Sequence, residues 1–217
     1  MNIHTKYQPQ DLSEIVGQSP VNRLRELAKD PFPSCWMLEG EPGTGKTTSA
    51  LAFAAELGCH DEFSGLWTVE CGDWGVDDAK ELFGRTLRLR FGSSSGFNVA
   101  VLEELDYLSP QCQRYLKTAL DPMGTMPQNL IVVATSNDAT KLERALLQRF
   151  HLLAFSSGKY FQQACLDRLQ TIWHCETGQV NLPPTAKLWG DDGQGFSMRV
   201  ALNHLSDAAN REHRKSQ

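Results

Sequence analysis

The chain has 217 residues, of which 41% are hydrophobic and 22% are charged, and its formal net charge at pH 7 is −5. This composition is typical of a folded globular protein and argues against the disordered, collagen-like and disulfide-scaffold classes. The negative balance also argues against a basic surface over the whole molecule, so any contact with nucleic acid is expected to be local.

The apolar runs of the sequence, its first residues and its cysteines argue against further classes of protein. No apolar run approaches the roughly 20 residues that a membrane-spanning helix needs, and Met1 to Lys6 lack the apolar core of a signal peptide. We therefore expect a cytoplasmic protein with no membrane partner. The six cysteines form no C-x-x-C pair, which predicts reduced thiols and no zinc site.

The first two thirds of the chain alternate short apolar runs with segments whose apolar residues recur at helical spacing. Near-continuous apolar strands that alternate with helices are typical of a parallel sheet covered on both faces. The sequence therefore predicts an α/β fold. The predicted strands are 34–38, 66–70, 98–102, 130–134 and 152–155, and the predicted helices are 47–57, 77–90 and 110–120.

The pattern changes after the last predicted strand. The Ser-Ser-Gly run at 156–158 has the composition of a linker. A helical apolar stripe over 161–173 follows it, and a second helix is predicted over 196–209. We predict two domains, an α/β domain over 1–155 and a small helical domain over 156–217.

The phosphate-loop pattern G-x-x-x-x-G-K-[ST] occurs at Gly40 to Thr47, between a predicted strand and a predicted helix, which is the context that the motif requires. Its glycines allow backbone N–H groups to surround a phosphate at the start of the helix. We expect Lys46 to reach the β- and γ-phosphates of ATP and Thr47 to offer its hydroxyl to Mg²⁺. The predicted nucleotide-binding residues here are Glu41, Pro42, Gly43, Thr44, Gly45, Lys46, Thr47 and Thr48.

Two acidic residues follow the third predicted strand. ATP hydrolysis on such a sheet needs one carboxylate beside the metal ion and another beside the attacking water. We assign Glu103 to the metal and Glu104 to the general base. The alternative interpretation is that these acids cap the next helix, although Asp106 and Ser109 could do so without them.

Further segments, spread over nearly the whole chain, follow a family pattern. With them the chain resembles the AAA+ ATPases, and within these the small subunits of DNA sliding-clamp loaders. The resemblance implies a P-loop AAA+ module, with a five-stranded parallel sheet between helices, followed by a small all-helical lid domain. The segments are Lys6-Tyr7-Gln8-Pro9, Val16-Gly17-Gln18, Ser109 to Asp121, Val132 to Asn137, Ala145 to Phe150 and Gly195 to Asn203.

The resemblance also implies roles for single residues. Asn137 would orient the lytic water, with Ser136 as the second candidate. Arg199 of the lid would stabilise the charge that develops in the transition state, and Arg149 would do so as an arginine finger at the nucleotide of a neighbouring subunit. The residues implied to line the adenine pocket are Tyr7, Val16 and Gly17.

Several features depart from the family pattern. Glu103 stands where aspartate is usual, and its extra methylene is expected to weaken the positioning of Mg²⁺ and to slow hydrolysis. Gln8 stands where arginine is usual, and 148–150 lack the family's serine and cysteine, so Arg149 is assigned partly by position. The sequence also ends soon after the lid, whereas clamp-loader subunits carry a further helical collar domain, so we expect assembly to depend on nucleotide or a partner.

Contacts with DNA would come from helix starts and local polar side chains, which hold phosphates without reading the base sequence. The family resemblance points to two helices. A solvated helix face is the alternative interpretation of these residues. The candidates are Lys80, Arg85, Ser109 and Gln113.

The leading hypothesis for function is an ATP-hydrolysing, clamp-loader-like AAA+ subunit, which assembles into a ring or spiral and acts on DNA in replication or repair. Its implied partners are other AAA+ subunits, a sliding clamp or another DNA-bound protein, and DNA. One alternative is a nucleotide-binding AAA+ scaffold or regulatory subunit with little hydrolysis, which Glu103 and Gln8 favour. Another is a branch-migration-type AAA+ DNA motor.

Overall fold

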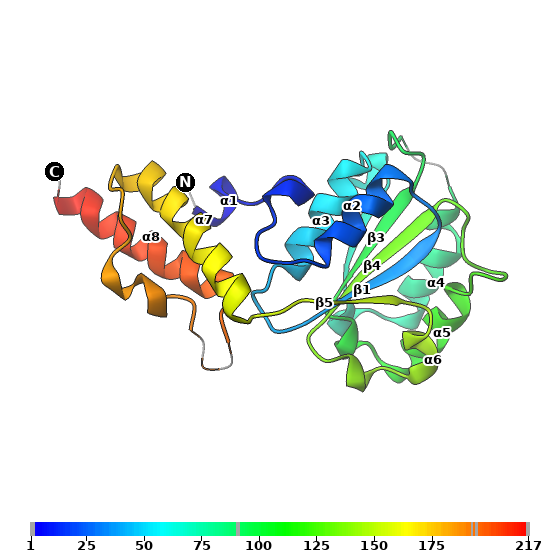
Figure 1. The fold of residues 1–217 in the computed structure, drawn as a ribbon. Coiled ribbons are helices and arrows are strands. Elements are labelled where there is room, and N and C mark those ends of the chain that lie inside the picture. The colour runs from blue at the N-terminus through cyan, green and yellow to red at the C-terminus, as the bar shows by residue number, and fades with distance from the viewer. Residues whose placement is uncertain (1–2, 90–91, 192, 194, 216–217) are drawn as a thin grey trace.

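The computed structural model describes residues 3–89, 92–191, 193 and 195–215. Its centre is a five-stranded sheet in the order β2-β3-β4-β1-β5, and all four pairings between neighbouring strands are parallel. The predicted five-stranded parallel sheet is therefore confirmed (Figure 1). The strands are β1 (Ser34–Glu39), β2 (Leu66–Glu70), β3 (Asn98–Glu103), β4 (Leu130–Ser136) and β5 (His151–Ala154).

Helices cover both faces of the sheet (Figure 1). On one face lie α2 (Val21–Lys29) and α3 (Lys46–Glu56), and on the other lie α4 (Val76–Gly84), α5 (Pro110–Ala119) and α6 (Arg144–Leu147). The side chains of a strand alternate between the two faces, so a strand with a continuous apolar run makes both faces apolar. The near-continuous apolar runs of the central strands thus reflect burial on two sides, as predicted.

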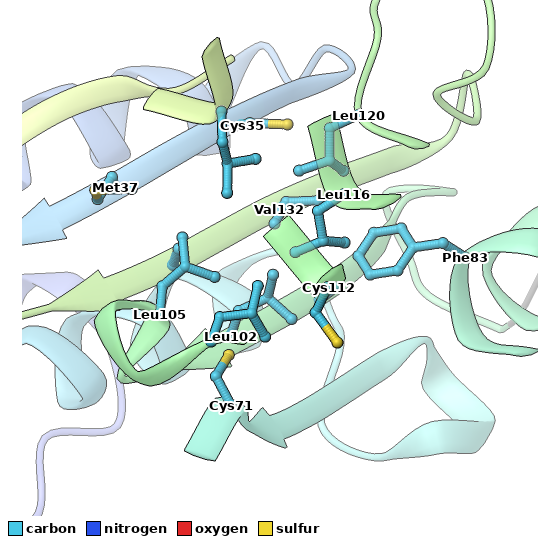
Figure 2. Packing of buried hydrophobic residues seen from close by; sticks show 14 of the residues in the cluster. Cys35, Met37, Cys71, Phe83, Leu102, Leu105, Cys112, Leu116, Leu120 and Val132 are labelled. Carbon is cyan, nitrogen blue, oxygen red and sulfur yellow. The ribbon is translucent and has the colours of Figure 1, made fainter. Parts of the chain in front are cut away.

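The alternation is clearest in β3. Val101 joins the core under α2 and α3, whereas Leu102 joins the core under α4 and α5. Figure 2 shows the second of these cores, in which Phe83 of α4 and Leu116 of α5 lie over Leu102 and Val132 of the sheet. The carboxyl ends of β3, β4 and β1 lie next to one another along one edge of this packed sheet.

One predicted helix is shorter than expected. The periodicity predicted a helix over 77–90, but α4 ends at Gly84, because Arg85 leaves the helical conformation with φ −125° and ψ −63°. The chain continues through a 3-10 turn at Thr86–Arg88. The side chain of Asn98 holds this region by donating to the carbonyl oxygens of Leu87 and Leu89, at 3.1 and 2.8 Å.

Two helices, α7 (Lys159–Thr177) and α8 (Met198–Lys215), follow the sheet and pack against each other as the predicted helical lid. Their core contains Trp173 and Leu205. The short N-terminal helix α1 (Ile3–Lys6) also belongs to this part in space, since Ile3 is buried in the same cluster (Figure 1). Among the described residues, no helix combines the length and apolarity needed to cross a bilayer.

Candidate nucleotide site

The phosphate loop joins β1 to α3 and touches the lid directly. Gly43 and Gly45 have φ of +76° and +92°, a conformation that side chains disfavour. Gly43 meets a second restriction, because a Cβ there would lie 1.9 Å from Ser197 Oγ. The backbone N–H of Met198, the first residue of α8, donates to the carbonyl oxygen of Gly43 at 3.1 Å. The start of α8 is therefore fastened to the loop.

Lys46 begins α3 and is only 8% exposed. Its Nζ donates to the carbonyl oxygens of Gly40 and Glu41, at 2.6 and 2.9 Å, and to Asn137 Oδ1 at 2.9 Å. An ammonium group has three hydrogens, so these contacts occupy all of its donors. Burial lowers the pKa of Lys46 to about 8, while the negative charge of Asp106 opposes the shift. A phosphate bound here would supply the opposite charge that this buried ammonium lacks.

The two residues assigned to the metal lie together. Thr47 Oγ1 donates to Glu103 Oε2 at 3.1 Å, which joins the first turn of α3 to the end of β3. The longer side chain of glutamate therefore still reaches the threonine hydroxyl. Both groups are hard oxygen donors, the kind that Mg²⁺ prefers in phosphate-loop enzymes.

Glu104 has an unusual backbone conformation. It is the only non-glycine residue with positive φ among the described residues, at φ 54° and ψ 50°. This left-handed conformation costs free energy for any residue with a Cβ. The N–H of Glu104 donates to Thr135 Oγ1 at 3.1 Å, and its carboxylate side chain is exposed at the pocket. The bend thus turns the carboxylate out of the sheet and towards the pocket.

A buried carboxylate holds the end of β4. Asp106 has a fully buried side chain, and its Oδ1 accepts from the N–H of Asn137 at 3.2 Å. Its Oδ2 lies 3.5 Å from Nζ of Lys141. Asp106 therefore supports the residue that also contacts Lys46. The cap of α5 is Ser109, whose Oγ accepts from the N–H of Cys112 at 3.3 Å, so this helix is capped without Glu103 or Glu104, which were the acids of the alternative interpretation.

Lys46, Thr47, Glu103, Glu104 and Asn137 line one pocket of about 350 Å³ between the sheet edge, the N-terminal segment and the lid. Glu41 and Gly17 are absent from its lining: Glu41 contributes its carbonyl to Lys46, and Gly17 packs behind Phe161, whose Cα would lie 2.9 Å from a Cβ at Gly17. The predicted residues that do line the pocket are Tyr7, Val16, Pro42, Gly43, Thr44, Gly45, Lys46, Thr47, Thr48, Glu103, Glu104, Asn137 and Arg199.

Four further pocket residues lie on α7, and the sequence prediction treated this helix as lid core. They are Phe161, Cys165, Arg168 and Ile172. Their spacing of four, three and four residues places them on one helix face. Arg168 interrupts that apolar face with a charge, and this interruption was the available signal for a role at a ligand. Near them, Tyr7 is held by its hydroxyl, which donates to Glu176 Oε1 at 2.7 Å.

Arg149 lies away from the pocket of its own chain. Its Nε donates to the carbonyl oxygen of Lys117 at 3.3 Å, and its Nη2 lies 3.5 Å from Asp121 Oδ2. The side chain is 30% exposed at the C-terminal end of α5. A role at the phosphates of the same chain is therefore excluded in this conformation, and the assignment to a neighbouring subunit remains a prediction.

The four candidate DNA contacts differ in their surroundings. Lys80 and Arg85 are exposed and pair along α4 with Asp77 and Glu81, at 2.8 and 3.0 Å. Ser109 is exposed at the start of α5.

Gln113 is the exception, and its predicted role is wrong in this conformation. It is only 5% exposed. Its amide donates to the carbonyl oxygen of Leu108 at 3.0 Å and accepts from the N–H of Glu143 at 2.8 Å. The side chain is therefore committed to joining α5 to the start of α6.

Comparisons with known proteins agree with this geometry. The family described as "ATPase family associated with various cellular activities (AAA)" matches residues 36–157, which is more than half of the chain. A replication factor C small subunit from Staphylothermus marinus is 28% identical over 206 residues, covering 94% of this chain and 60% of the relative. Replication factor C subunit 2 of Arabidopsis thaliana is 30% identical over 206 residues, covering 92% and 59%. The chain thus spans about 60% of the length of these relatives.

Solved structures share the fold at lower sequence identity. The RuvB Holliday junction branch migration motor of Thermotoga maritima aligns with a TM-score of 0.67 and 19% identity, covering 92% of this chain and 64% of that one. A DNA polymerase III gamma subunit-related protein from the same organism aligns with a TM-score of 0.60 and 12% identity, covering 87% and 58%. With the family match, the sheet order and the phosphate loop in place, the chain belongs to the AAA family of ATPases.

Proposed function

We propose that this chain binds and hydrolyses ATP with Mg²⁺ as a clamp-loader-like AAA+ subunit, which assembles with other AAA+ subunits and acts on DNA. The observation that carries the proposal is the convergence of Lys46, Thr47, Glu103, Glu104 and Asn137 at one sheet edge, opposite Arg199 of the lid. Each group has the chemistry that phosphoryl transfer needs, and the pocket is large enough for a nucleotide.

The metal would be held by Thr47 and Glu103, whose oxygens already lie 3.1 Å apart. When bound, Mg²⁺ supplies positive charge to the β- and γ-phosphate oxygens. Lys46 adds charge from the loop, and Arg199 adds charge from the lid. These positive charges favour the transition state because they stabilise the negative charge on the oxygens of the transferred group.

Glu104 is the proposed general base. Its carboxylate is exposed at the pocket, and the left-handed backbone holds it at the end of β3. Asn137 is the proposed orienter of the attacking water. Its backbone N–H donates to Asp106, and its side-chain oxygen accepts from Lys46. A base and an orienting amide on neighbouring strand ends can act on the same water.

The proposed partners rest on the similarity to replication factor C subunits. Similarity to replication factor C subunits over more than nine tenths of this chain supports a sliding clamp and other AAA+ subunits as partners. Arg149 would act at the nucleotide of a neighbour, which accounts for its distance from the pocket of its own chain. Lys80, Arg85 and Ser109 remain the proposed contacts to DNA phosphates.

Steady-state ATP hydrolysis, measured with and without primed DNA, tests the proposal. We expect turnover in the wild type that rises with DNA and is lost in Glu104→Gln. A chain that binds ATP but shows no turnover above the Glu104→Gln background would contradict the catalytic role. That outcome would favour a nucleotide-binding scaffold, the second candidate, for which the replacement of aspartate by Glu103 is the supporting observation.

A further inference from the structure

Gln18 joins three segments that are far apart in the sequence. It is 7% exposed. Its Nε2 donates to the carbonyl oxygens of Thr44 and Ser156, at 3.1 and 2.9 Å, and its Oε1 accepts from the N–H of Ser156 at 3.1 Å. A side-chain amide offers two donors and one acceptor group, so this residue type can satisfy all three backbone groups at once.

Each partner of Gln18 belongs to a functional segment. Thr44 lies in the phosphate loop, is fully buried, and donates through Oγ1 to the carbonyl oxygen of Glu41 at 2.8 Å. That same carbonyl accepts from Lys46. Ser156 lies between β5 and α7, where the chain leaves the sheet for the lid. Gln18 therefore joins the loop that holds Lys46 to the segment that leads from the sheet into the lid.

The start of α8, the second helix of the lid, also contacts the phosphate loop. Gly43 contacts Ser197, and its carbonyl oxygen accepts from the N–H of Met198. The next residue along α8 is Arg199, which lines the pocket. The phosphate loop is thus bonded to the first residue of α8 directly and, through the side chain of Gln18, to Ser156 in the segment that precedes α7.

We propose that Gln18 is a positioning residue of the nucleotide site, which holds the phosphate loop and the start of the lid in one arrangement. Through this arrangement it sets where Arg199 lies relative to Lys46. Losing the amide would leave the carbonyl oxygen of the buried Thr44 without this partner and would release the backbone C=O and N–H of the exposed Ser156, and the lid would then adopt a wider range of positions. The inference rests on the proposed function for its catalytic consequence only.

The test measures the position of the lid directly. Cys175 on α7 is exposed, whereas the other five cysteines are buried. A second thiol is introduced by Met123→Cys, at a side chain that is 93% exposed in the sheet domain. Spin labels at these two sites report the distance between sheet and lid by electron paramagnetic resonance. The variants are Gln18→Met, which keeps the length of the side chain but loses all three bonds, and Gln18→Glu, which keeps only the acceptor.

The matched control is Gln128→Glu, at an exposed loop position. Without nucleotide, we expect a broader distance distribution in both Gln18 variants than in the wild type and the control. With ATP, we expect kcat to fall by on the order of tenfold or more, since small displacements of catalytic groups are costly. Thermal unfolding identifies any variant that is not folded, and the other variant then decides.

Two outcomes separate the Gln18 inference from the proposed function. An unchanged distance distribution in a folded Gln18 variant would overturn the inference, whatever the ATPase rate. Absence of ATP binding in the wild type would overturn the proposed function, while the distance measurement without nucleotide would still decide the role of Gln18.

Discussion

Lys46 Nζ donates a hydrogen bond to Asn137 Oδ1 at 2.9 Å, and this contact joins the phosphate loop to the end of β4. A phosphate at the loop would compete with Asn137 for this donor. The amide would then be free to contact a water beside the γ-phosphate. The contact therefore links occupancy of the loop to the group proposed to orient the water.

Lys46→Ala is expected to abolish nucleotide binding measured by calorimetry, because it removes the charge that meets the β- and γ-phosphates. Lys29→Ala, at an exposed position on α2, is the matched control. ATP affinity equal to that of the wild type would show that the loop does not hold the phosphates in this chain.

Nucleotide binding should also depend on pH. Burial lowers the pKa of Lys46 from 10.5 to about 8, so the folded protein loses this proton at a lower pH than the unfolded chain does. The cost of burying the charged form is present in full below pH 8 and disappears as the pH rises towards 10.5. Bound phosphates raise this pKa again, so binding is expected to take up a proton above pH 8 and to weaken as the pH rises. Calorimetry in buffers of different ionisation enthalpy measures this uptake. Lys46→Arg, which stays protonated, should show none.

Asp106 offers a test by stability. Asp106→Ala leaves the N–H of Asn137 without its acceptor, which is expected to cost about 1–3 kcal/mol in the free energy of unfolding. Asp106→Asn keeps an oxygen at the same place and should lose less stability and less turnover. Urea titration and ATPase rates of the pair measure both effects. Equal losses in the two variants would show that the charge, and not the acceptor, supports Asn137.

The elements that the sequence predicts well are those with strong local patterns. The strands follow from apolar runs such as Leu130 to Ala134, and the phosphate loop follows from glycines whose conformation the motif requires. Gln113 shows where such reasoning fails. It follows the buried Cys112 and lies one helical turn before the buried Leu116, yet its polar side chain suggested a surface role. Its actual partners, Leu108 and Glu143, are backbone groups, which no residue pattern identifies.

The role of Gln18 could not be predicted from the sequence for a related reason. Its hydrogen bonds reach Thr44 and Ser156, which lie 26 and 138 residues away. Such contacts depend on how the sheet and lid meet, and only the folded chain contains that information. The V-G-Q segment was assigned to the family pattern, but the work done by its glutamine could not be derived from the sequence.

Glu104 can be tested separately for chemistry and for backbone strain. Glu104→Gln is expected to keep ATP bound but to stop turnover, because an amide cannot accept the proton of the water. Glu104→Gly should be more stable than Glu104→Ala by about 1 kcal/mol, since glycine adopts φ 54° without the cost that a Cβ brings. Thermal unfolding of the Gly and Ala variants checks the second expectation, and the reverse order of stability would contradict it.

Glu103→Asp tests the proposed metal site. Removing one methylene withdraws the carboxylate from Thr47, whose hydroxyl now lies 3.1 Å from Glu103 Oε2. Octahedral Mg²⁺ needs room between its ligands. We therefore expect Glu103→Asp to need a lower Mg²⁺ concentration for turnover and to have a higher kcat. Glu103→Ala is expected to need a higher Mg²⁺ concentration and to have a lower kcat. An identical Mg²⁺ dependence in all three proteins would remove Glu103 from the metal site.

Arg149 is expected to act on the nucleotide of a neighbouring subunit. In its own chain it contacts the carbonyl oxygen of Lys117 and the carboxylate of Asp121, and it lies outside the pocket. Arg149→Ala should therefore leave ATP binding to a single chain intact. Hydrolysis in the assembly should fall by on the order of 10³-fold, the effect of losing an arginine finger.

Mixing Arg149→Ala with Glu104→Gln decides whether the site is shared. Each variant alone lacks one half of the machinery. In a mixed assembly, a pocket that keeps Glu104 can receive Arg149 from its neighbour, so activity should return at those interfaces and should pass through a maximum as the ratio of the two chains varies. Activity that stays at the level of the separate variants at every ratio would place Arg149 in a structural contact with α5. Binding measurements on the same mixtures must show unchanged ATP affinity, because only then does the recovered rate report on chemistry.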